Sequence, residues 1–434
     1  MDLPLDFLNS IRPLLNDDFP SFLASYDHPA VKGIRLNPFK PTANLDDYFD
    51  GKIPYVERGF YTLRQDLGSL AYHAAGCYYM QEPSAMFPAS VLRPEKGDKV
   101  LDLCAAPGGK SGQLAEYASE GVVVSNEIMG DRCKILLGNV ERMGYKNVVV
   151  TCLSPKDIAA SLGGWFDKVL VDAPCSGEGM LRKNPEAVKE WSLSNVRACA
   201  ERQAEVLYYG GQCVRKGGKL VYSTCTFSKE ENEEVVENFL KNGDFVLLKI
   251  NCDYGVQEGL DALGYTARLY PHKLRGEGHF AALFQRVKES ESVKDKNPLK
   301  DIPSKEKRDV DVFVNNYLKD KLDVKLYNGN LVIPPPICPP ITRGALSYGV
   351  KLAEVGEKVI IPHHQFFSSY GKLFQRQVDL SVNDERLSKY LHGEEISFDG
   401  ENGWCSILVE GAPLSGGKIV DCRVKNKLPK GLRK

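Results

Sequence analysis

The sequence predicts an α/β protein: a central domain with a mostly parallel sheet, a small N-terminal α+β domain and a C-terminal β-rich region. Two observations carry this prediction. Between residues 96 and 287, short apolar runs alternate with stretches of helical periodicity, which is the pattern of βαβ units in a parallel sheet. Residues 288–308 are almost wholly polar and charged, so we expect them to be a linker between two globular parts.

Length and composition indicate a globular chain with more than one domain. At 434 residues the chain is too long for one ordinary core, and 43% of its residues are hydrophobic and 26% charged. No apolar run approaches the length of a membrane span, and the first residues show no basic region followed by an apolar one. We therefore expect a cytoplasmic protein with no membrane partner.

The cysteines and histidines give no sign of a metal site. The chain has 12 cysteines and seven histidines, with no C-x-x-C pair and no Cys/His cluster at ligand spacing. In a reducing compartment most of these thiols should be small buried apolar side chains. We expect no metal, and two of the cysteines, discussed below, need another explanation.

Residues 1–95 are predicted to form the small mixed domain. The apolar spacing predicts a helix over Phe7–Leu15, and alternation predicts strands at 33–38 and 59–63. A further helix over Ala85–Leu92 leads into the central domain.

Residues 96–287 are predicted to be the catalytic domain. The last two of its strands, which a long connection joins, are expected to form the antiparallel edge that many such sheets carry. The strands are expected at Lys99–Leu103, Val122–Asn126, Val148–Thr151, Lys168–Asp172, Lys219–Ser223 and His279–Phe284.

Residues 309–434 are predicted to form a second globular unit of compact β structure. Proline runs at 334–336 and 339–340 and short apolar segments at Val359–Ile361 and Ser406–Val409 suggest it. Its end is basic, with six cations against one carboxylate between residues 419 and 434, which suits a polyanion. The overall net charge of −1 argues against non-specific coating of nucleic acid.

A glycine turn after the first central strand predicts a ligand site. Gly108 and Gly109 follow the strand and open a helix over Ser111–Tyr117, so free backbone N–H groups and the positive helix end face outward. The run Gly109-Lys110-Ser111 resembles the end of a P-loop, but Cys104 stands where the first P-loop glycine is needed. The G-x-G-x-x-G pattern is also absent, which leaves an adenosyl ligand without phosphates.

An acidic residue follows the next strand. Glu127 stands 18 positions beyond Gly109, where a carboxylate can hold both ribose hydroxyls of an adenosyl ligand. The position alone would be weak evidence, since acidic residues at strand ends are common. Together with the glycine turn it supports the adenosyl site.

Two thiols and a carboxylate follow adjacent strands. Asp172 and Cys175 come after one strand and Cys225 after the next, so parallel pairing should bring them to one crevice. Cytosine C5 is too weak a nucleophile to take a methyl group until a thiolate adds at C6, and a proton at N3, a job for Asp172, eases that addition. A disulfide redox pair is the remaining alternative, which a reducing compartment disfavours.

Three motifs resemble those of the Sun-type RNA cytosine-C5 methyltransferases, and the match covers nearly the whole chain. They are Leu103–Lys110, Asp172–Met180 and Tyr222–Thr226. Further stretches are similar to the bacterial RsmF/YebU branch, whose members modify 16S ribosomal RNA and end in a PUA-like RNA-binding module. They are Arg182-Lys183, Arg268–His272, Gly276–Phe280 and the basic Lys425–Arg433.

The resemblance implies a Rossmann-like class I methyltransferase domain, a PUA-like C-terminal region and S-adenosylmethionine as cofactor. Its substrate would be 16S ribosomal RNA, free or in the 30S subunit, bound by residues 1–95 and 309–434 of a monomer. The target base must leave its stack to reach the thiol.

The resemblance also assigns roles by position. Cys225 would attack C6, Cys175 would help release the product, and Asp172 would contact the base close to the methyl donor. Lys110 would approach the reacting groups, Glu127 would hold the ribose and Arg132 would support the donor pocket. That pocket would be lined by Cys104, Ala105, Ala106, Pro107, Gly108, Gly109 and Lys110.

One position departs from the family pattern, and two alternative functions stay open. The family usually has an acidic residue just after the third strand, near the adenine, whereas here Thr151–Lys156 intervenes before Asp157, the residue we expect there. The chain could instead be an RNA-binding assembly factor without turnover, which the intact Cys225, Cys175, Asp172 and Lys110 argue against. A thiol redox protein is disfavoured by the lack of C-x-x-C.

Overall fold

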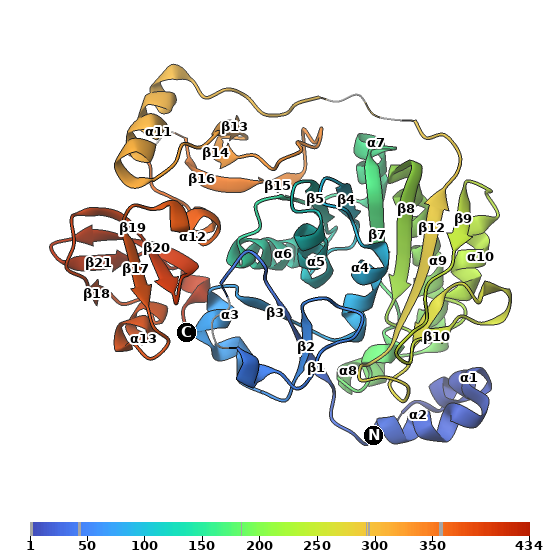
Figure 1. Ribbon diagram of the computed structural model, residues 1–434. Helices are drawn as coiled ribbons and strands as arrows, with labels where there is room; N and C mark the ends of the chain where they lie inside the picture. Colours follow the sequence, from blue (N-terminus) through green and yellow to red (C-terminus); the bar gives the residue numbers. More distant parts are fainter. Residues whose placement is uncertain (1–2, 42–44, 184, 292, 294–295, 356–358) are drawn as a thin grey trace.

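The computed structural model describes residues 3–41, 45–183, 185–291, 293, 296–355 and 359–434. Among these residues the centre is a mixed ten-stranded sheet in the order β10-β11-β12-β8-β7-β4-β5-β6-β15, with β9 paired to β12 (Figure 1). None of the helices in this described part combines the length and apolar character that crossing a membrane requires.

Five strands of the central sheet run parallel, as the alternation of apolar and helical segments predicted. Their valine-rich runs are buried on both faces, which is typical of a parallel sheet covered by helices. They are β4 (Lys99–Asp102), β5 (Val122–Asn126), β6 (Val148–Thr151), β7 (Phe166–Asp172) and β8 (Val214–Thr224).

The remaining strands extend both ends of the sheet. Strand β12 pairs antiparallel with β8, as predicted, but it is not the edge. Strand β15 comes from the C-terminal region and pairs antiparallel with β6. The bounds are β9 (Phe245–Leu248), β10 (Gln257–Glu258), β11 (Ala267–Leu269), β12 (His279–Arg286) and β15 (Ala345–Tyr348).

Helices cover both faces of this sheet because successive strand residues point to opposite sides. Val100 packs with the helices of one face and its neighbour Leu101 with those of the other. The first set is α4 (Phe87–Leu92), α5 (Gly109–Tyr117) and α6 (Gly130–Met143), and the second is α7 (Pro155–Leu162), α9 (Leu193–Cys213) and α10 (Glu233–Leu240).

The N-terminal region has two parts (Figure 1). A helical hairpin packs Phe7 and Phe22 against Trp191 and Phe227 of the central domain. A three-stranded antiparallel sheet in the order β2-β1-β3 follows it. The elements are α1 (Leu5–Leu15), α2 (Phe19–Ser25), β1 (Lys32–Leu36), β2 (Gly59–Thr62), α3 (Ala71–Ala74), β3 (Tyr78–Gln81) and, against the hairpin, α8 (Pro185–Glu190).

The C-terminal region contains a three-stranded sheet and a five-stranded sheet. The first has the order β13-β14-β16 and the second β17-β19-β20-β21-β18. The elements are α11 (Ser304–Tyr317), β13 (Lys325–Tyr327), β14 (Asn330–Ile333), β16 (Val350–Glu354), α12 (His364–Tyr370), β17 (Gln377–Leu380), α13 (Glu385–Leu391), β18 (Ile396–Ser397), β19 (Gly403–Val409), β20 (Ala412–Val420) and β21 (Arg423–Asn426).

Short 3₁₀ turns connect many of these elements. They lie at Asn16–Asp18, Asp46–Tyr48, Leu67–Ser69, Ser84–Met86, Glu178–Met180, Asp261–Leu263, Gly371–Leu373 and Lys430–Leu432.

Two local expectations for the second half of the chain differ from the structure. Val359–Ile361 forms no strand, and both Val359 and Ile361 are largely exposed. Helix α11 begins at Ser304, inside the stretch expected to be a linker, because Val310, Phe313 and Val314 beyond it give the helix an apolar face to bury. How the chain divides into functional units remains a prediction.

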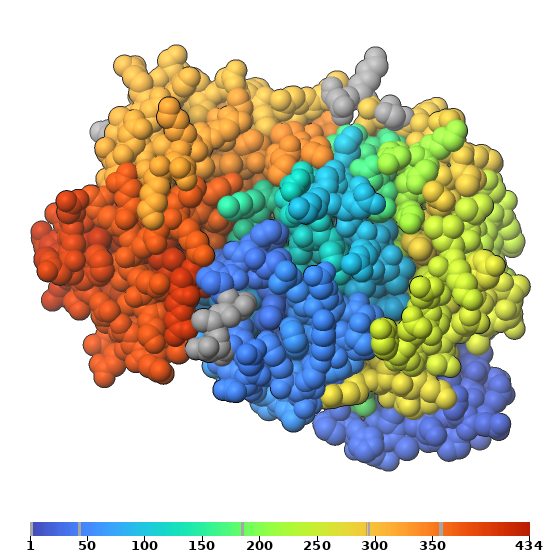
Figure 2. All heavy atoms as spheres, in the orientation of Figure 1, coloured from blue at the N-terminus to red at the C-terminus, as the bar shows by residue number. Residues whose placement is uncertain are grey.

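The N-terminal and C-terminal regions share one hydrophobic core. Ile34 and Tyr78 of the first region pack in the same buried cluster as Leu380 and Ile407 of the second. At the chain end, Lys434 Nζ donates a hydrogen bond to the backbone oxygen of Leu70 at 2.8 Å. Figure 2 shows the blue and red parts of the surface in contact along this boundary.

Candidate active site

The carboxyl ends of β7 and β8 bring the two predicted cysteines together. The Sγ atoms of Cys175 and Cys225 lie 3.1 Å apart, and the backbone N–H of Cys225 donates to Cys175 Sγ at 3.3 Å. Both are free thiols. Their approach follows from the parallel register, which places Asp172 opposite Ser223.

The Asp172 carboxylate lies beside the thiols and has three polar neighbours. Lys110 Nζ donates to Asp172 Oδ2 at 2.8 Å, and Ser223 Oγ donates to Oδ1 at 2.7 Å. His279 Nε2 stands 3.5 Å from Oδ1, a distance at the limit of a hydrogen bond. The structure therefore assembles the predicted Lys110, Asp172, Cys175 and Cys225 and adds His279.

The electrostatics fix the charge state of this group. Burial alone would raise the pKa of Asp172, but the cationic Lys110 and the His279 side chain outweigh burial and hold it below its usual range. The same pairing outweighs the effect of burial on Lys110 and raises the pKa of Lys110. The Cys225 sulfur beside it, together with burial, raises the pKa of Cys175 well above the usual thiol value. Asp172 is thus an anion, Lys110 a cation and Cys175 a neutral thiol at pH 7.

The glycine turn lies beside this cluster at the start of α5. Gly108 adopts a φ of +111°, a conformation that favours glycine, and a Cβ on Gly109 would lie 3.0 Å from the Gln81 side chain. Both positions therefore have a local reason to be glycine. The turn keeps the backbone of residues 108–110 free of side-chain bulk at the helix N-terminus.

Glu127 ends the neighbouring strand with an unsatisfied oxygen. Its side chain is buried, its Oε1 accepts the Met129 N–H at 3.0 Å, and its Oε2 accepts no hydrogen bond. Arg132 places Nη1 3.3 Å from that Oε2 and donates from Nη2 to the Ala106 oxygen at 2.9 Å. A buried carboxylate oxygen left open next to the glycine turn fits a diol such as the ribose of an adenosyl ligand.

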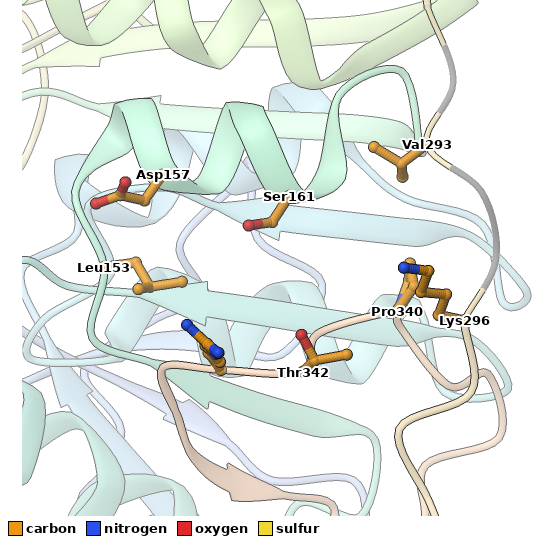
Figure 3. A pocket seen from close by; sticks show the side chains of 8 residues that line it. Leu153, Asp157, Ser161, Val293, Lys296, Pro340 and Thr342 are labelled. Atoms are coloured by element: carbon orange, nitrogen blue, oxygen red, sulfur yellow. The ribbon is translucent and has the colours of Figure 1, made fainter.

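Asp157 lies on helix α7, which follows β6. It occupies the first turn of α7, where its N–H donates to Ser154 Oγ at 3.1 Å and its carboxylate accepts from that hydroxyl at 2.6 Å. With Leu153 and Ser161 it lines a cavity of about 510 Å³ that contains neither the glycine turn nor Glu127 (Figure 3). Its contact with an adenine stays a prediction.

Two buried glutamates that the sequence reasoning missed hold the cysteine loops in place. Glu231 Oε2 accepts from the Ser176 N–H at 2.9 Å and from Gln203 Nε2 at 2.7 Å. Glu178 accepts from the Phe227 N–H at 2.9 Å and from Trp191 Nε1 at 3.1 Å. These hydrogen bonds connect the loop after β7, which carries Cys175, to the loop after β8, which carries Cys225. They therefore help to fix the positions of the two thiols.

His279 was also missed as a neighbour of Asp172, although a signal existed. It is the first residue of β12, and Phe280 lies opposite Thr224 of β8. The predicted antiparallel pairing of these strands, with its register, would have placed His279 at the same crevice as Cys225.

Fold and site together define an S-adenosylmethionine-dependent methyltransferase. The parallel sheet, the glycine turn without a P-loop and the open Glu127 oxygen suit the adenosyl group, and the thiols and Asp172 occupy the adjacent strand ends. The cofactor supplies an electrophilic methyl group when it is bound.

Comparison with known families identifies the chain more closely. Residues 89–285 match the model of the 16S rRNA methyltransferase RsmB/F, residues 3–83 the N-terminal domain of 16S rRNA methyltransferase RsmF, and residues 377–434 the methyltransferase RsmF PUA domain. Ribosomal RNA small subunit methyltransferase F of Vibrio cholerae is 31% identical, over 100% of this chain and 98% of the relative. The Vibrio atlanticus protein of that name is 31% identical, over 99% and 97%.

Two solved structures are similar to this fold. A methyltransferase homologue from Pyrococcus horikoshii is 27% identical with a TM-score of 0.56, covering 66% of this chain and 100% of that one. NSun6 from the same organism, solved with SFG, shares the fold at 22% identity and a TM-score of 0.57, covering 66% and 99%. The chain belongs to the 16S rRNA methyltransferase RsmB/F family, in its RsmF branch, and is an S-adenosylmethionine-dependent rRNA methyltransferase.

Proposed function

We propose that this methyltransferase forms 5-methylcytosine in 16S ribosomal RNA through a covalent bond between Cys225 and C6 of the base. The pair of thiols 3.1 Å apart beside the Asp172 carboxylate carries this proposal. A methyltransferase that acts on an already nucleophilic nitrogen or oxygen needs no thiol at its reacting centre, whereas cytosine C5 requires one.

The reaction balances with these residues. The Cys225 thiolate adds to C6 while N3 gains a proton from the Lys110–Asp172 pair, which leaves an electron pair on C5. C5 takes up the methyl group with release of S-adenosylhomocysteine. C5 then loses its hydrogen as a proton to water, the C5–C6 double bond re-forms, the Cys225 sulfur leaves C6 with the electron pair of the C–S bond, and N3 returns its proton to the Lys110–Asp172 pair.

The charge states support these roles. The Lys110 ammonium donates one N–H to the Asp172 carboxylate at 2.8 Å. The pair can pass that proton to N3 as the base enters. Cys175 is a neutral thiol because the neighbouring sulfur and burial raise its pKa. Its sulfur lies 3.1 Å from the Cys225 sulfur, so its proton can stabilise that sulfur as it leaves C6, and Cys175 thereby assists product release.

The donor pocket is proposed to consist of residues 104–110 with Glu127 and Arg132. The open Glu127 Oε2 would accept the ribose hydroxyls and Arg132 would orient that carboxylate. Asp157 is proposed for the adenine on the resemblance alone.

Recognition of the RNA is proposed to rest on residues 1–95 and 309–434. Base flipping into the crevice requires the surrounding RNA to be held, and both regions flank the catalytic sheet (Figure 1). We propose that the enzyme acts as a monomer in the cytoplasm on 16S RNA, free or in 30S subunits.

The test follows tritium from the methyl group of S-adenosylmethionine into 16S RNA and 30S subunits, with nucleoside analysis of the product. Wild type should yield 5-methylcytidine. Cys225→Ala should give no product, and Cys175→Ala should accumulate an RNA adduct that survives denaturing electrophoresis. Cys252→Ala, at a free thiol between β9 and β10 and outside the proposed RNA-binding regions, serves as the matched control.

Each other outcome has a definite meaning. Undiminished labelling with Cys225→Ala would show that Cys225 is not the nucleophile. A labelled nucleoside other than 5-methylcytidine would refute the cytosine-C5 chemistry. Binding of donor and RNA without any label would favour an assembly factor. Reversible oxidation of the two thiols without any methyl transfer would favour a redox protein.

A further inference from the structure

A second cavity lies where the three parts of the molecule meet. It has a volume of about 340 Å³. Phe39 and Lys40 come from the N-terminal region, Lys146 from the central domain, and Tyr370 and Lys372 from the C-terminal region. Lys146 precedes β6, so the cavity opens at the amino-terminal edge of the sheet, opposite the edge that carries Asp172 and the thiols.

The cavity is cationic and has no acidic lining residue. Lys40, Lys146 and Lys372 all line it, and among the residues that the structure describes none of the three forms an ion pair. Positive charges on these three side chains repel one another because no carboxylate lies among them, and an anion between them would relieve that repulsion.

Lys40 forms the floor of the cavity. Its side chain is buried, and its Nζ donates to the backbone oxygens of Ser368 at 2.5 Å and Pro413 at 2.7 Å. An ammonium has three N–H donors, so one remains. Burial lowers the pKa of Lys40 to about 7, and the charges of Lys146, Arg142 and Lys372 lower it too, so an anion here would favour its cationic form.

The rim combines two exposed cations with aromatic rings. Lys146 Nζ lies 4.1 Å from the centre of the Tyr370 ring, and Phe39 keeps 45% of its surface exposed although it is large and apolar. Lys146 and the stacked Phe366 ring cover Tyr370, so Phe39 is the exposed ring of this pocket. Cations beside an accessible ring are the combination that nucleic-acid-binding surfaces use for phosphates and bases. Ser369 adds a buried hydroxyl without a hydrogen-bond partner.

We propose that this junction pocket binds the phosphodiester backbone of the ribosomal RNA substrate, at a point remote from the target base. Lys146 and Lys372 contact phosphate oxygens, Lys40 closes the floor, and Phe39 offers its exposed ring to a neighbouring nucleotide. The proposal rests on the rRNA substrate and not on the cytosine chemistry, so the two can fail separately.

The position has a functional consequence. A contact at the opposite edge from the thiols can add affinity and orientation without touching the reacting atoms. Because the pocket is built from all three regions, it forms only in the assembled molecule. A bound backbone would therefore also hold the regions in their mutual arrangement.

The experiment measures equilibrium binding of the full-length protein to 16S rRNA over a salt series without methyl donor. Each neutralised phosphate contributes about 0.7 to 0.9 to the slope of log K on log salt. Lys146→Gln/Lys372→Gln should therefore lower the slope by about 1.5 and, with binding at 1 M salt unchanged, weaken binding about 30-fold at 0.1 M salt. The RNA concentration for half-maximal methylation should rise by a similar factor, with the plateau rate unchanged.

The control pair is Lys96→Gln/Lys216→Gln, which removes the same charge from exposed lysines that face Glu120 and Glu289. Equal effects of the two pairs, or an unchanged slope for the pocket pair, overturns the proposal. A defect confined to 30S subunits with normal binding of free 16S rRNA would assign the pocket to a ribosomal protein. Loss of stabilisation by inorganic phosphate with normal RNA binding would assign it to a small anion.

Discussion

Glu178 behind the cysteine loops gives the sharpest test of the electrostatic reasoning. Its carboxylate is 2% exposed and accepts from the Phe227 N–H and Trp191 Nε1. Burial raises its pKa from 4.5 to about 7, and the nearby Glu231 also raises it, while its hydrogen bonds oppose the rise. The substitution Glu178→Gln keeps the shape of the side chain and removes the ionisation.

The sign and size of the effect follow from linkage. Since Glu178 binds its proton more tightly in the folded than in the unfolded chain, its contribution to stability is complete below pH 4.5 and is lost as the pH rises to about 7. A rise of the Glu178 pKa from 4.5 to about 7 corresponds to a difference of about 3 kcal/mol in the free energy of unfolding. The free energy of unfolding of wild type, relative to Glu178→Gln, should therefore fall by about 3 kcal/mol between pH 4.5 and 8.

The assay is urea unfolding at several pH values, followed by tryptophan fluorescence. Trp191 touches Glu178 directly and is one of three tryptophans in the chain. Glu234→Gln makes the same charge change at an exposed position of α10 and should show a difference from wild type that hardly varies with pH. A constant difference for Glu178→Gln, or one that grows in favour of wild type as the pH rises, would refute the reasoning.

Three further substitutions test the donor pocket, the packing and the charge pair. Glu127→Gln should weaken S-adenosylmethionine binding by about 10- to 100-fold in calorimetry, because it removes a charged acceptor of the proposed ribose bonds. Arg268→Met should lower the free energy of unfolding by about 3–5 kcal/mol in urea, because buried Glu233 loses its ion pair, and Arg268→Met/Glu233→Leu should recover much of it. Lys110→Met should raise the pKa of Asp172, because His279 then opposes the effect of burial without the lysine, and methylation at pH 7 should fall at least about 100-fold while RNA binding stays near wild type.

The sequence indicated the central sheet and most of the site because both depend on local signals. Val122–Asn126 and Val148–Thr151 are strands with the expected bounds, since valine-rich runs between turns have few alternatives. The parallel order of such strands then brings residues that follow them, such as Cys175 and Cys225, to one edge.

What the sequence did not indicate depends on distant parts of the chain. Strand β15 pairs with β6, from which nearly two hundred residues of sequence separate it, and no local pattern predicts that pairing. No pattern in the sequence marks Glu178 or Glu231 as a buried acceptor, and only the folded packing shows that both are. The core that the N-terminal and C-terminal regions share could not be predicted for the same reason, because its residues are far apart in the sequence.

That shared core bears on how the protein can be made. Ile34 and Tyr78 are synthesised some three hundred residues before Leu380 and Ile407, with which they are buried. The N-terminal sheet must therefore wait, with its apolar face uncovered, until the last strands leave the ribosome. A chain cut short before residue 377 would keep every catalytic group and still lack the cover for that face, so it should aggregate when it is expressed alone.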